Sequence, residues 1–93
     1  MDKNKLKLAR NKVDQLDQKI FNLIKKRTQI VKYMLSLKKF RREIVNHKRN
    51  NEIYRKIKNK SIKNKIDPKL TRRIWKAMIW GYVDFQRRNF KKK

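Results

Sequence analysis

The chain has 93 residues, of which 31 are Lys or Arg and 7 are Asp or Glu, so its formal net charge is +24. It contains no cysteine, which excludes disulfide frameworks, cysteine-zinc sites and thiol catalysis. His47 is the only histidine, which argues against His-paired metal sites and a Ser-His-Asp triad, and single Gly and Pro residues argue against β-hairpins and Gly-rich phosphate loops. No apolar run is long enough to cross a membrane. We therefore expect one small all-α domain, residues 1–93, in the cytoplasm, with no metal or cofactor.

The high positive charge is typical of proteins that bind nucleic acid, because clustered cations release counterions from phosphate backbones. Here the basic residues are spread along the whole chain, and Lys outnumbers Arg 21 to 10. Asn and Ile are also abundant, so part of the charge can reflect codon composition. The charge alone does not establish a nucleic-acid partner.

The first predicted helix covers about residues 3 to 39, where apolar residues recur at alternating spacings of three and four. Two lines of positions carry the pattern: Leu6, Val13, Ile20, Arg27 and Met34, and Ala9, Leu16, Leu23, Ile30 and Leu37. Five heptads indicate a long helix packed against other helices. Such a helix would be about 55 Å long, too long for a compact monomer of this size. We therefore predict a dimer.

Two further helices are predicted. One covers roughly Arg42 to Lys60, with residues 59 to 64 as a fraying end or loop. The other begins at Asp67-Pro68, since Asp can cap a helix and Pro fits its first position, and runs to about Phe90. Its Trp and Phe residues are expected in the core, whereas His47 is expected to be exposed.

Polar residues interrupt the apolar faces of these helices. Arg27, Arg49 and Gln86 fall on the inner line of the first, second and third helix, respectively. A guanidinium at an inner position needs an anionic partner, and the seven acidic residues are too few and mostly placed elsewhere. A small bound anion would meet this need. The alternatives are a register-setting or snorkelling Arg27 and an ordinary buried amide at Gln86.

Helix geometry relates Arg27 to other cations. Lys38 follows it by 11 residues, which on a continuous helix is about 20° from the same face and about 16 Å along the axis. The two side chains could then converge on one small ligand. Arg10 lies about 25 Å away and about 100° around the helix. Arg10 can therefore reach that ligand only from a second protomer.

The order of these residues resembles the all-helical chorismate mutase family. The similarity lies in Leu8-Ala9-Arg10, Val13-Asp14-Gln15-Leu16-Asp17, Leu23-Ile24-Lys25-Lys26-Arg27 and Lys38, and continues through Arg49, Ile53, Ile66-Asp67-Pro68 and Ile74 to Gln86. The resemblance covers essentially the whole chain. It implies three helices in an intertwined homodimer that converts chorismate to prephenate, in aromatic amino-acid biosynthesis.

Site residues follow from the resemblance. It implies that Arg27 and the partner protomer's Arg10 bind the carboxylates of chorismate, and that Lys38 contacts a carboxylate and the ether oxygen. Gln86 would bond the same oxygen, and Arg49 would support the carboxylate-binding end. Catalysis of this kind restrains a compact conformer and stabilises charge on the oxygen, so it needs no nucleophile or metal.

This chain departs from the family's pattern at the residues that bind the hydroxyl group of the substrate, a role that the resemblance assigns to the residue directly after Arg49. Members usually carry Glu at position 50 and often Asp at position 46, where this chain has Asn50 and Asn46. Isochorismate-pyruvate lyases of the same fold lack that Glu, and their last helix is similar to the segment around Tyr82, which we place with the substrate-binding residues. The lyase is one alternative function, and a basic helical nucleic-acid-binding protein is the other.

Overall fold

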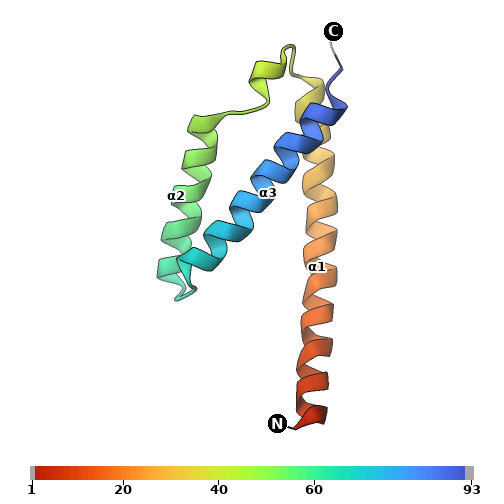
Figure 1. Ribbon diagram of the computed structural model, residues 1–93, viewed down its shortest axis with the longest axis vertical. Helices are drawn as coiled ribbons and strands as arrows, with labels where there is room; N and C mark the ends of the chain where they lie inside the picture. The colour runs from red at the N-terminus through yellow and green to blue at the C-terminus, as the bar shows by residue number, and fades with distance from the viewer. Residues whose placement is uncertain (1, 92–93) are drawn as a thin grey trace. The chain divides into compact units, whose positions relative to one another are not determined.

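The computed structural model describes residues 2–91 and contains three α-helices and one short 3-10 helix, with no strand in that range. The helices are α1 (Lys3–Ser36), η1 (Arg41–Glu43), α2 (His47–Lys63) and α3 (Pro68–Asn89) (Figure 1). The predicted all-α class is confirmed. The chain divides into two compact units, one ending at Tyr33 and the other beginning at Met34, which are described separately. Over the described residues, no helix combines the length and apolarity that a membrane span requires.

The first unit consists of α1 up to Tyr33. The predicted heptad pattern lies on one continuous helix, and most of its apolar side chains are exposed in the single chain, among them Val13, Leu16, Ile20, Leu23 and Ile30 at 53–62%. Arg27 is half-buried and Arg10 is exposed. The helix therefore presents a long apolar stripe that the chain itself leaves open.

The end of α1 differs from the prediction, because the helix stops at Ser36 and not near residue 39. The amides of Leu37 and Lys38 donate to carbonyls three residues back, Met34 and Leu35, which tightens the last turn. The next two amides, Lys39 and Phe40, instead donate to the Glu43 carboxylate at 2.7 and 2.8 Å. This carboxylate offers the backbone an alternative to helical bonds, so Lys38 does not lie on the helical face deduced from a continuous helix.

The second helix was also predicted with the wrong bounds, because it begins at His47 and continues to Lys63. The segment before it forms η1, which the sequence pattern did not indicate. Asn46 is the N-cap: its side-chain oxygen accepts a hydrogen bond from the Arg49 amide at 3.0 Å. The start of α2 is thus fixed by a short polar side chain and not by an apolar pattern.

A tight turn joins α2 to α3, and the two helices form a hairpin (Figure 1). Lys65 takes a left-handed conformation (φ 57°), and the Ile66 amide donates back to the Ser61 carbonyl at 2.9 Å. Asp67 caps α3 by accepting from the Lys69 amide at 2.9 Å, and Pro68 occupies the first turn, which confirms the predicted start.

The core of the second unit is small and contains polar groups. Ile44, Ile79 and Val83 are its buried apolar side chains. Near the turn, the buried Ser61 hydroxyl lies 2.7 Å from the Thr71 hydroxyl and bonds the Ile57 carbonyl, so α2 and α3 meet through small side chains. Trp80, expected in the core, is 39% exposed, because it lies beside the buried face of α3 that carries Ile79 and Val83 and not on it.

Replacing Asp67 with Ala should lower the free energy of unfolding by about 1 kcal/mol, because α3 loses its N-cap. Asp67→Asn is the matched control, since the amide oxygen can still accept from the Lys69 amide. Urea denaturation followed by circular dichroism measures both variants. Equal loss in both would contradict capping as the role of Asp67.

Candidate functional site

The structure brings two of the predicted site residues into direct contact. The Lys38 ammonium group donates a hydrogen bond of 2.6 Å to the side-chain oxygen of Gln86. Gln86 is 7% exposed on the inner face of α3, as predicted, and Lys38 is half-buried in the segment after α1. This contact joins residues 48 positions apart in the sequence.

The contact determines how the Gln86 amide is oriented. A lysine side chain only donates hydrogen bonds, so the amide oxygen must face Lys38. The amide nitrogen then donates to the Tyr82 carbonyl at 3.2 Å, one turn earlier on α3. One N–H of the Gln86 amide and two N–H groups of Lys38 are not used by these two bonds. The pair can therefore present donors to an electron-rich atom.

Burial and a nearby carboxylate act in opposite directions on Lys38. Desolvation lowers the pKa of the Lys38 ammonium from its usual 10.5, and the negative charge of Glu43 partly offsets this by raising it. The pKa of Glu43 is itself lowered, first by the amide hydrogen bonds from Phe40 and Lys39 and then by the neighbouring charges of Arg42 and Lys38. Glu43 thus holds the backbone around Lys38 and also interacts with its charge.

The candidate residues of α2 lie at its N-terminal end. Asn46 is the N-cap, and the backbone N–H of the half-buried Asn50 donates to the backbone carbonyl of Asn46 at 2.9 Å. Arg49 was predicted on an inner line but is exposed, with its side chain 55% accessible and 3.6 Å from the Glu52 carboxylate. An exposed pair of this kind contributes little stability, so the Arg49 guanidinium can exchange Glu52 for another anion.

The remaining candidates lie on α1 and α3. Arg10 and Arg27 belong to the first unit, 17 residues apart on α1, which corresponds to about 25 Å along its axis. Tyr82 is half-buried on α3, with its ring edge-on to Phe85 at 6.3 Å between centroids. The second unit therefore holds Lys38, Asn46, Arg49, Asn50, Tyr82 and Gln86.

Sequence reasoning did not identify Glu43 or Arg41, which organise the segment around Lys38. The Arg41 guanidinium donates to the Arg87 carbonyl at 3.2 Å and lies 5.3 Å from the Phe90 ring centroid, so it attaches η1 to the end of α3. The one signal in the sequence was an isolated Glu three residues after an aromatic residue in a basic stretch, a spacing suited to capping.

Removing the Glu43 charge should lower the pKa of Lys38 further, because the interaction that raises it is lost while its burial stays. Glu43→Gln keeps an oxygen that can accept the amide hydrogen bonds of Lys39 and Phe40. Glu52→Gln is the matched control, because Glu52 pairs with Arg49 on α2. NMR titration of the Lys38 side-chain carbon next to the ammonium measures both. An unchanged or raised Lys38 pKa in Glu43→Gln would contradict this account.

Comparison with known proteins gives one family. The family model for chorismate mutase type II matches residues 9–87, a span that includes every candidate site residue. Neither the curated proteins nor the solved structures give a significant match to the chain. The family match does not favour the lyase or the nucleic-acid-binding alternative. The chain therefore belongs to the type II chorismate mutase family, all-helical isomerases whose substrate is chorismate.

Proposed function

We propose that the chain converts chorismate to prephenate at a site that includes the Lys38–Gln86 pair, and the hydrogen bond between these two side chains is the observation that carries the proposal. The reaction is an internal rearrangement in which the ether C–O bond breaks while a new C–C bond forms. No proton, electron or leaving group is exchanged. The protein needs only to hold the substrate in a compact conformer and to stabilise charge on the ether oxygen.

The donors of the Lys38–Gln86 pair suit that oxygen. The free amide N–H of Gln86 and the ammonium group of Lys38 would donate to it as the C–O bond lengthens and negative charge develops. Because the two side chains already bind each other and Gln86 is anchored to the Tyr82 carbonyl, little reorganisation is needed during the reaction.

Cations would bind the two carboxylates of the substrate. Arg27 and the partner protomer's Arg10 would take one or both carboxylates, with Lys38 bridging to the ether oxygen. Arg49 would support this end of the site, since its exposed pair with Glu52 is easily exchanged. The net charge of +24 would draw a dianionic substrate toward the protein.

Asparagine side chains would bind the hydroxyl of the substrate in place of the usual acids. The side-chain oxygen of Asn46 already accepts from the Arg49 amide, which leaves its NH2 group as a donor. Asn50 is half-buried, and the hydrogen bond that caps α2 uses the side chain of Asn46 and not that of Asn50. The side-chain carbonyl of Asn50 would therefore accept from the hydroxyl, and Tyr82 would line the same region.

A homodimer would complete the site. The apolar stripe of α1 is exposed to solvent in the single chain, and exposed apolar surfaces of that extent mark protein interfaces. A second copy of α1, with the same heptad pattern, would cover the stripe and supply Arg10 in trans. We propose that both units work together as one domain, residues 1–93, in the cytoplasm, and that nucleic acid is not its partner.

Gln86→Leu should lower kcat for prephenate formation by about 10²–10³, because one donor to the ether oxygen is lost. Gln15→Leu on the outer face of α1 is the control and should keep its kcat. Chorismate loss is followed by absorbance, with prephenate and pyruvate separated and isochorismate assayed in parallel. Pyruvate and salicylate from isochorismate, with little prephenate, would contradict the mutase assignment.

Two inactive variants should restore activity when mixed. Arg10→Ala and Lys38→Ala would each be inactive alone, but a mixed dimer would contain one site with an intact Lys38 and an intact Arg10 from the other chain. Equal mixing with subunit exchange should give about a quarter of the wild-type activity, since half of the dimers are mixed and each has one intact site. No recovery, with subunit exchange verified, would show that Arg10 does not act in trans.

A further inference from the structure

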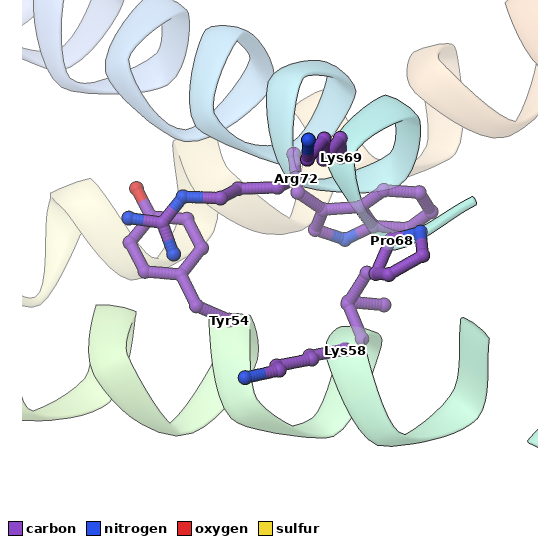
Figure 2. Close-up of a pocket in the computed structure, with 7 residues that line it drawn as sticks. Tyr54, Lys58, Pro68, Lys69 and Arg72 are labelled. Carbon is purple, nitrogen blue, oxygen red and sulfur yellow. The ribbon is translucent and has the colours of Figure 1, made fainter. Parts of the chain in front are cut away.

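A cavity lies between α2 and α3, away from the Lys38–Gln86 pair (Figure 2). Its volume is about 190 Å³. Its apolar lining comes from Ile57 on α2 and from Pro68 and Trp75 on α3. None of the residues assigned to the chorismate site lines this cavity. For comparison, an apolar cavity of about 150 Å³ holds a benzene molecule, so there is room for one six-membered ring.

The polar lining of the cavity is entirely cationic except for one tyrosine. Lys58, Lys69 and Arg72 line it, and no carboxylate of the described residues does. Within residues 2–91, Arg72 forms no ion pair; its guanidinium lies over the Tyr54 ring, 5.7 Å from the centroid (Figure 2). The nearby Asp67 is engaged as the cap of α3. The cavity therefore carries positive charge that the described part of the chain does not neutralise.

The tyrosine in this cavity has an unsatisfied polar group. The Tyr54 hydroxyl is buried and, among the described residues, has no hydrogen-bond partner. A buried hydroxyl without a partner is costly, and a phenol is a good donor to an anion. A carboxylate drawn to Arg72 would supply the acceptor that this hydroxyl lacks.

A wider groove adjoins the cavity. It has a volume of about 550 Å³ and shares Tyr54, Lys58 and Arg72 with it. The groove adds two further cations, Arg55 and Lys76, as well as the candidate site residue Asn50, and no carboxylate of residues 2–91 lines it. A ligand can therefore reach the cavity along a path lined by positive charge, which favours anions over neutral molecules of the same shape.

We propose that this cavity binds a small organic anion that consists of one compact apolar ring and a carboxylate. The ring occupies the space beside Trp75 and Ile57, and the carboxylate binds the Arg72 guanidinium and accepts from the Tyr54 hydroxyl. The cavity shares no residue with the proposed chorismate site, although the groove that leads to it includes Asn50, and anion binding in the cavity does not depend on mutase activity.

Benzoate is the probe, titrated into the full chain. Binding is followed by calorimetry and by the NMR shift of the Trp75 indole N–H. We expect saturable binding that shifts this signal, with much weaker binding of inorganic phosphate, which lacks the ring, and of benzyl alcohol, which lacks the charge. Phosphate binding as tightly as benzoate would overturn the proposal, because it would show that the ring is not recognised.

Substitutions separate this cavity from general charge. Arg72→Gln should weaken benzoate binding at least about tenfold, because it removes a charge-assisted pair. Arg73→Gln, which removes the same charge from the next, exposed residue outside the cavity, should leave binding unchanged. Equal weakening in both would show that binding follows net charge and would overturn the proposal.

Further variants distinguish binding in this cavity from loss of folding and from binding at another site. Lys58→Gln, with the exposed Lys56→Gln as its control, repeats the comparison on α2 in case Arg72→Gln does not fold. Tyr54→Phe should weaken binding severalfold by removing the hydroxyl donor. Benzoate binding that is lost in Arg27→Ala but kept in Arg72→Gln would place the anion outside this cavity and refute the proposal.

Discussion

The hydrogen bond between Lys38 and Gln86 is the interaction on which the arrangement of the candidate site in the second unit depends. It joins the segment after α1 to the buried face of α3, and it sets the orientation of the Gln86 amide. Glu43 supports it indirectly, by holding the Lys39 and Phe40 amides and by placing negative charge near the Lys38 ammonium group. One exposed carboxylate thus shapes both the backbone and the charge of the candidate site.

Positive charge has different consequences at different places in this chain. Along the surface it is spread evenly and is only weakly informative about function. Where cations surround a space without any carboxylate, as in the cavity between α2 and α3, they create a demand for an anion that the fold itself does not meet. Because the chain has only seven acidic residues, it is simple to check that none of them lines this cavity.

The sequence predicts those features that depend on local signals. Asp67-Pro68 marks the start of α3, heptad spacing predicts a continuous α1, and the apolar line of the third helix predicts an inward Gln86. The end of α1, η1 and the start of α2 were missed, because side chains of Glu43 and Asn46 bond the backbone there and no apolar period reports on it. The prediction that Trp80 lies in the core was wrong, because the size of a side chain does not show which face of α3 packs against the rest of the unit.

The exposed apolar stripe of α1 belongs to a chain of charge +24, so ionic strength would have opposite effects on dimer formation and on substrate binding. Two such chains repel each other, so screening by salt would tighten the proposed dimer. The same screening would weaken the attraction of a dianionic substrate. In a dilute sample, the turnover rate would therefore pass through a maximum as salt is added. In a concentrated sample, where the chains are already dimeric, added salt would only lower the rate.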